Sequence, residues 1–204
     1  QELARRTAAG VRQCGFLESP QHVLAHHPGW CLPLSRMKDR FTRFIEDPLA
    51  SHVYSARDAF DFQAVSRAMQ PLAGELDRHI EDLLQRDPAF IRHMASDSLM
   101  NQPPRTIFQG YVVDREGTRR DRLAIKSHAL LPIVDAARVL ALESGSHRPT
   151  STYLRLVEAA RKAEGEGQRA AHLREVAEAF LVAQFARVSQ GLKTGTDGAF
   201  INPG

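Results

Sequence analysis

The segment LAIKSHALLPIVDAARVL, residues 123–140, places Lys126, Asp135 and Arg138 in an otherwise apolar run. Asp135 and Arg138 are three residues apart, so on a helix they share one face and can pair with each other. A buried ion pair is costly unless further partners satisfy both groups, and Lys126 at the start of the helix is a candidate partner. Two interpretations have equal weight: a structural polar network, or a surface that faces a ligand.

Arg120, Arg122 and Lys126 belong to the densest basic segment of the chain, residues 115–126. If this segment is a short hairpin, alternate residues share a face, and guanidinium groups can pair bidentately with phosphate oxygens. A solvated edge is the default interpretation. The sharper one is a surface for a nucleotide phosphate or an acidic protein. Nucleic acid is disfavoured as a partner, because aromatic residues make up only 7% of the chain and scarcely interleave with the basic ones.

We predict no metal site in this chain. His22, His26 and His27 include a pair four residues apart, but no cysteine or carboxylate follows at a matching spacing and Pro28 interrupts any helix. Asp114 and Glu116 flank an expected turn, where acidic side chains are ordinarily solvated. The sequence also contains no glycine-rich phosphate loop and no nucleophile elbow.

The composition is that of a globular protein. Hydrophobic residues make up 43% and charged residues 25% of the 204 residues, and the formal net charge is +3. No apolar run approaches the length of a membrane span, and the N-terminus lacks a secretory pattern. The two cysteines, Cys14 and Cys31, form no disulfide framework, so we expect reduced thiols and a cytoplasmic location.

Hydrophobic periodicity predicts a mainly α fold, an antiparallel helical bundle with a minor strand or hairpin element. Ser35 and Thr150 are expected N-caps. AFDFQAV, residues 59–65, alternates as a half-buried strand would, and a hairpin is expected around a polar turn at 115–118. Helices are expected at 2–14, from 35 to Pro48, from Pro71 through Leu84, from 88 to Pro103, at 128–143, from 150 through 160, and at 168–192.

Three segments, taken in order, resemble a known family: GFLESPQHVLAHHPGWCLPLSRMKDRFTRFIEDP, AFDFQAV and RDRLAIKSHALLPIVDAARVLAL. They are similar to bacterial proteins related to the PII-protein uridylyltransferases and glutamine-synthetase adenylyltransferases. In that family a nucleotidyltransferase domain, often preceded by CBS and cyclic-nucleotide-binding-like domains, is followed by a helical putative nucleotidyltransferase substrate-binding domain. The resemblance implies that residues 1–65 are the C-terminal remnant of the transferase domain and that 66–204 are the helical domain.

The resemblance also implies roles for residues. Asp61 would supply a carboxylate near the transferase site, and the remaining candidates would bind substrate or nucleotide: Lys126, Asp135, Arg138, Arg120 and Arg122. The family's Gly-Ser and paired-aspartate motif, which binds metal and triphosphate, lies upstream in such proteins and is absent here. We therefore expect no activity from this chain alone, with Mg²⁺ and a nucleoside triphosphate handled by the intact protein. The chain departs from the family pattern at Gln63, where an arginine is usual, and at Ala124, where an acidic residue is usual.

Two functions remain open at this stage. In the first, the helices form one wall of a nucleotidyltransferase cleft, and the partners are the upstream transferase and sensor domains, a nucleotide and an acceptor protein. In the second, the chain is a non-catalytic helical module for regulation or protein interaction. The position of the charged trio discriminates between them, since an open cleft favours the first and a closed internal network favours the second.

Overall fold

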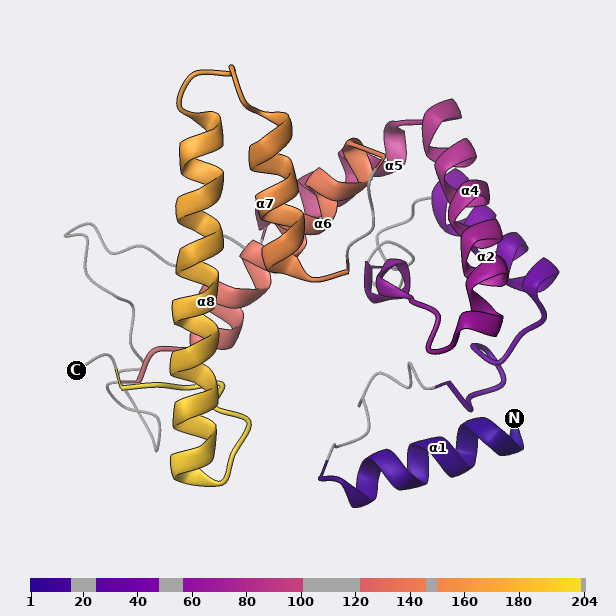
Figure 1. The fold of residues 1–204 in the computed structure, drawn as a ribbon, viewed down its shortest axis with the longest axis horizontal. Coiled ribbons are helices and arrows are strands. Elements are labelled where there is room, and N and C mark those ends of the chain that lie inside the picture. Colours follow the sequence, from indigo (N-terminus) through magenta and orange to yellow (C-terminus); the bar gives the residue numbers. More distant parts are fainter. Residues whose placement is uncertain (16–24, 48–56, 101–121, 146–149, 203–204) are drawn as a thin grey trace. The chain divides into compact units, whose positions relative to one another are not determined.

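The computed structural model describes residues 1–15, 25–47, 57–100, 122–145 and 150–202. These ranges are mainly α-helical (Figure 1), which confirms the predicted fold class. They contain no strand; one antiparallel bridge joins Leu123 to Ile201. The predicted hairpin around 115–118 lies outside the described residues. In the described ranges, no helix combines the length and apolar character that crossing a bilayer requires.

The chain forms two compact units, one made of residues 1–47 and 64–86 and the other of 48–63 and 87–204. The two units are defined by contacts within the folded chain, and this division does not show which family domain a residue belongs to. The predicted domain boundary at residue 65 therefore stays a prediction.

The first unit is built around helices α2 (Leu34–Glu46) and α4 (Gln70–Arg86), which pack against each other. Two polar contacts also link these helices: an exposed one from Lys38 Nζ to Glu75 Oε1 at 2.6 Å, and a partly buried one between Thr42 Oγ1 and His79 Nε2 at 2.9 Å. The predicted N-cap at Ser35 is wrong, because α2 begins at Leu34. The unit also contains α1 (Glu2–Gln13) and the 3-10 turn η2 (Arg67–Met69). The buried apolar side chains of α2 and α4 are Phe41, Phe44, Ile45, Leu76, Ile80, Leu83 and Leu84.

The second unit holds the remaining helices. The α6–α8 core contains Ala137, Leu156 and Ala177, one from each helix, with Leu140 and Leu173 packed against them. Ser151, and not Thr150, occupies the N-cap position of α7. In chain order the elements are the 3-10 turn η1 (Arg57–Asp61), α5 (Ala89–Met100), the π-helical turn η4 (Lys126–Leu130), α6 (Leu131–Glu143), α7 (Thr152–Lys162) and α8 (Arg169–Thr194).

The strand predicted at residues 59–65 is wrong, because Arg57–Asp61 form the turn η1. Phe60 is 1% exposed, and its ring centroid lies 5.4 Å from that of Phe90 on α5. The alternation of aromatic and polar residues thus reflects one aromatic anchor and not a pleated strand. In a 3-10 turn, residues three apart are eclipsed, so Asp58 and Asp61 lie on the same side.

The segment after α8 folds back onto that helix. Gly195 ends α8 in the left-handed conformation. A side chain at Gly198 would collide with the carbonyl oxygen of Arg187, so this close approach requires glycine. Backbone bonds between Leu123 and Ile201, of 2.8 and 2.9 Å, fasten the returning segment to the approach to η4.

Asp197 adds a pH-dependent link to this segment. It accepts a hydrogen bond from the Ala199 amide at 3.1 Å and lies 3.3 Å from Lys126 Nζ, and these contacts hold the pKa of its carboxyl below the ordinary value. A lowered folded-state pKa contributes stability above the unfolded pKa of about 3.9, and this contribution is lost as the pH falls through the folded value. We expect an NMR titration of Asp197 to have its midpoint below 3.9 and Lys126→Ala to raise that midpoint partway. A midpoint unchanged by Lys126→Ala would contradict the ion pair.

Candidate functional site

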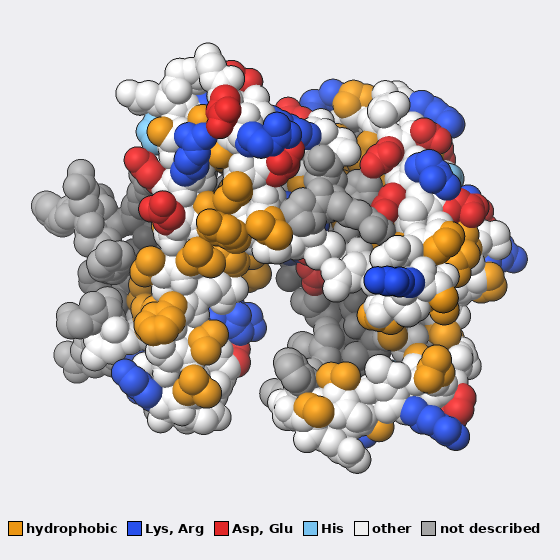
Figure 2. Space-filling view, viewed as in Figure 1, with side chains coloured by type: hydrophobic (Ala, Val, Ile, Leu, Met, Phe, Trp, Pro, Cys, Tyr) orange, Lys and Arg blue, Asp and Glu red, His pale blue; other side chains and the backbone are white. Residues whose placement is uncertain are grey.

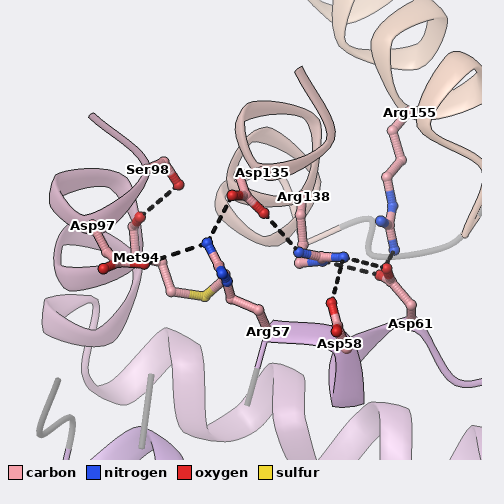
Figure 3. A network of polar contacts seen from close by, with 9 residues as sticks. All are labelled: Arg57, Asp58, Asp61, Met94, Asp97, Ser98, Asp135, Arg138 and Arg155. Atoms are coloured by element: carbon pink, nitrogen blue, oxygen red, sulfur yellow. Dashed lines mark hydrogen bonds and ion pairs between the residues drawn. The ribbon is translucent and has the colours of Figure 1, made fainter. Parts of the chain in front are cut away.

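A network of arginine and aspartate side chains lies inside the second unit (Figure 3). It draws together η1, α5, α6 and α7, four elements that are far apart in the sequence. The members are Arg57, Asp58, Asp61, Asp97, Asp135, Arg138 and Arg155.

Arg138 on α6 is the centre of the network and is 3% exposed. Its Nη2 donates to Asp61 Oδ2 at 2.5 Å, and its Nε donates to Asp61 Oδ1 at 3.3 Å, which makes a bidentate pair. Nη1 donates to Asp135 Oδ1 at 3.1 Å, and Nη2 also lies 3.4 Å from Asp58 Oδ1. Burial lowers the pKa of Arg138, but the hydrogen bond that it donates to Asp61 and the charges of the three carboxylates outweigh this effect, and the net shift of the pKa is upward.

Asp135 links Arg138 to the turn η1. It is 4% exposed, and its Oδ2 accepts a hydrogen bond from Arg57 Nη1 at 2.7 Å. The same nitrogen of Arg57 lies 3.5 Å from Asp97 Oδ2 on α5. Burial raises the pKa of the Asp135 carboxyl, because its removal from water outweighs the attraction of Arg57 and Arg138. The carboxyl is thus held in place by two guanidinium groups from two different elements.

Arg155 on α7 completes the network from the other side. It is 2% exposed, and its Nη2 lies 2.7 Å from Asp61 Oδ1. Both oxygens of Asp61 are therefore engaged by guanidinium groups. Asp61 joins η1 to α6 and α7 at a single carboxyl.

The network is closed at its basic centre and reaches solvent at its acidic edge. The arginines are nearly buried, whereas the side chains of Asp58 and Asp97 are 64% and 35% exposed. With three arginines and four aspartates, the formal charge of the network is −1 (3 − 4). A cavity of about 180 Å³ lies at the C-terminal ends of α6 and α7, and no member of the network lines it. The arrangement can hold four elements in fixed positions relative to one another, but none of its side chains lines that cavity.

The structure brings together three of the residues singled out from the sequence: Asp61, Asp135 and Arg138. Asp135 and Arg138 pair with each other, as their spacing predicts. Lys126 does not join them, because its Nζ lies at the surface beside Asp197. Arg122 is exposed, and Arg120 lies outside the described residues. The binding and catalytic roles assigned to these residues stay predictions.

Sequence reasoning missed the other four members: Arg57, Asp58, Asp97 and Arg155. Arg155 carries no local signal either: it lies between Leu154, which is 48% exposed, and the buried Leu156, and adjacent residues on a helix do not share a face. The other three lie in η1 and on α5, where nothing in the local pattern distinguishes them from solvated charges.

The Mg²⁺ that the resemblance implies does not fit the described residues. Among them, no group of three or more histidine, cysteine or acidic side chains is placed to hold a metal ion. The carboxylates of Asp61 and Asp135 instead accept hydrogen bonds from guanidinium groups on both oxygens, which occupy lone pairs that a hard cation would need. No metal-dependent step is therefore assigned to these residues.

Two family models match the sequence. The one described as putative nucleotidyltransferase substrate binding domain matches residues 88–204, and the one described as putative nucleotidyltransferase DUF294 matches residues 1–50. The chain matches no curated protein and no solved structure. The first match covers α5 through α8 and so contains Asp97, Asp135, Arg138 and Arg155. The turn η1, which carries the other members of the network, lies between the two matched regions.

Proposed function

Because the chain belongs to the putative nucleotidyltransferase substrate binding domain family, we propose that it is the substrate-binding part of a bacterial nucleotidyltransferase. One observation carries the proposal: a transferase model matches residues 1–50 and the substrate-binding model matches residues 88–204 of the same chain. The transferred group is a nucleoside monophosphate, taken from a nucleoside triphosphate. The catalytic metal and the triphosphate belong to a transferase domain upstream of the region described here.

In this proposal the network positions the wall of the cleft and does not react. Asp61 has both carboxylate oxygens on Arg138 and Arg155, which supports a positioning role over a catalytic one. The turn η1 lies between the two matched regions, so its anchoring to α6 and α7 ties the connecting segment to the helical unit. Two exposed basic groups, Lys126 at the first position of η4 and Arg122 four residues before it, are then the candidates for contact with phosphate.

The finer assignments follow the sequence resemblance. They are a PII-uridylyltransferase-like reaction in signal transduction, upstream sensor domains of the CBS and cyclic-nucleotide-binding-like kinds, an acceptor protein, and a bacterial cytoplasmic location. Like the roles of Lys126 and Arg122, they are proposals.

A second candidate function is a non-catalytic helical module for regulation or protein interaction. The closed network favours it, because Asp135 and Arg138 satisfy each other and their neighbours and line no part of the cavity described above. The two functions differ in what Lys126 and Arg122 do, and a kinetic experiment separates them.

Calorimetric titration of the chain with ATP or UTP and magnesium is expected to show at most weak binding and no transfer. In a protein that includes the transferase domain, Lys126→Ala and Arg122→Ala are expected to raise KM about tenfold each, the loss of one phosphate contact of roughly 1.4 kcal/mol. Arg161→Ala, which removes an exposed ion pair with Glu158, is the matched control and should leave KM unchanged. An unchanged KM in both test variants would favour the interaction module, and transfer by this chain alone would overturn the assignment.

A further inference from the structure

The turn η4 interrupts an otherwise continuous helix. From Ile125 to Glu143 the backbone is helical throughout, but the amide of Leu131 donates to the carbonyl oxygen of Lys126, five residues earlier and not four. A π turn of this kind contains one residue more than the α-helical turn that it replaces. It is rare, so the sequence or the packing around it must supply a cause.

Pro132 supplies this cause. It is the second residue of α6 and follows directly after the π bond that Leu131 makes. Its ring nitrogen carries no hydrogen, so it cannot donate to the carbonyl oxygen of His128 as an α-helix requires, and its ring would collide with that oxygen. A shift of one residue just before the proline loses no hydrogen bond at position 132 and moves the two groups apart. The π turn therefore lies where the sequence makes an α-helical turn unfavourable.

The helix is held at both ends, and η4 takes up the offset between them. Upstream, Leu123 exchanges two backbone hydrogen bonds with Ile201, and the amide of Lys126 donates to the carbonyl oxygen of Ala199 at 3.3 Å. Downstream, Arg138 is fixed inside the buried network. Both anchors are satisfied together only with the extra residue in the turn, because a regular α-helix would rotate one end relative to the other.

The π turn also sets the direction of the Lys126 side chain. Each residue of an α-helix adds about 100° of rotation and about 1.5 Å of rise. If α6 continued upstream as a regular α-helix, Lys126 would point about 100° away from its present direction. In the structure its side chain is 46% exposed, and Nζ lies 3.3 Å from Oδ2 of Asp197. The exposed position beside Asp197 is thus a consequence of the turn.

The direction of a lysine matters on this surface because charges of both signs lie close together. On the face that Figure 2 shows, lysine and arginine side chains of the described residues are interspersed with acidic ones. The pair of Lys126 with Asp197 is exposed on both sides, so it is weak and leaves the ammonium group available to a phosphate.

We propose that Pro132 positions Lys126 for its contact with phosphate by keeping η4 in the π form. The inference rests on the proposed function for the role of Lys126, and it adds a residue that carries no charge and does not touch the phosphate. With alanine at position 132, an amide becomes available for the carbonyl oxygen of His128, and the α-helical register gains a hydrogen bond. The turn upstream then rotates, and Lys126 leaves Asp197.

Pro132→Ala in the 204-residue chain tests the position of Lys126. The amide introduced at position 132 should be protected from hydrogen exchange at least about tenfold, because it donates to His128. The NMR titration midpoint of Asp197 should rise by as much as in Lys126→Ala. Pro88→Ala is the matched control: Pro88 is exposed and directly precedes α5, where a helix has no bond to lose, so the midpoint of Asp197 should not move. An unprotected amide at position 132, or an unmoved midpoint in Pro132→Ala, would overturn the proposal.

A double-mutant cycle tests whether Pro132 acts through Lys126. In a protein that includes the transferase domain, Pro132→Ala should raise KM about 3- to 10-fold and leave kcat unchanged, because it removes a binding contact and no reacting group. The double variant Pro132→Ala, Lys126→Ala should have the KM of Lys126→Ala alone, since both substitutions remove the same contact. Multiplied effects would show that Pro132 acts through another residue and would refute the positioning role. An unchanged KM in Lys126→Ala would instead contradict the proposed function, and the exchange and titration results would still decide whether Pro132 sets the position of Lys126.

Discussion

Arg138→Met is expected to lower the free energy of unfolding of the second unit by about 3–5 kcal/mol, the cost of breaking a buried ion pair by removing one partner. Methionine keeps most of the apolar volume of the arginine stem, but it leaves Asp61 with Arg155 alone and Asp135 with Arg57 alone. Asp135 is 4% exposed, so water does not replace the lost guanidinium. Urea denaturation and amide hydrogen exchange in α6 would measure the loss.

Two further variants show whether the effect comes from the buried network. Arg161→Met removes an arginine whose side chain is 66% exposed and pairs with Glu158, so it should leave the free energy of unfolding nearly unchanged. Arg138→Lys keeps the charge but loses the bidentate fork, and its stability should fall between those of wild type and Arg138→Met. Equal losses for Arg138→Met and Arg161→Met would contradict the structural role assigned to the network.

Phe60→Ala is expected to lower the free energy of unfolding of the second unit by about 3–5 kcal/mol, the usual cost of emptying a buried phenylalanine site. Phe60 is 1% exposed and packs on Phe90, and it is the apolar anchor of the turn that carries Arg57, Asp58 and Asp61. Losing the anchor also loosens the three network members on that turn. Hydrogen exchange at η1, α5 and α6 should rise together.

Phe62→Ala is the matched control, because it removes the same side chain two residues away at a less buried position. It should cost clearly less than Phe60→Ala. If the two variants lost equal stability, the segment would be anchored as a pleated strand would be, and the assignment of Phe60 as its single anchor would be wrong.

Short-range sequence patterns were sufficient to predict the helices and the pairing of Asp135 with Arg138. Both depend on spacing within one element, since residues three or four apart share a helix face whatever surrounds them. The same rule was misleading at residues 59–65, where the alternation of Phe60 and Phe62 with polar residues predicts a strand. Strand formation needs a partner strand, and in the described ranges this segment has none.

Other properties depended on tertiary contacts that no local pattern encodes. Asp61 meets Arg138 and Arg155 across 77 and 94 residues of sequence (138 − 61 and 155 − 61), and such distances depend on how the helices pack. Lys126 is a case in which the local sequence was misleading. Its position near Asp135 in the sequence predicted a contact between the two, but the segment that follows α8 places Asp197 beside Lys126 instead.

By itself, the sequence determined the mainly helical fold, the helix that bears Asp135 and Arg138, and the family to which the chain is similar. Only the tertiary structure decided that those two charges lie inside a closed network and that Lys126 lies outside it. The physical reason is that helix formation depends on residues within a few turns of one another, whereas the burial of a charge depends on every element that packs around it.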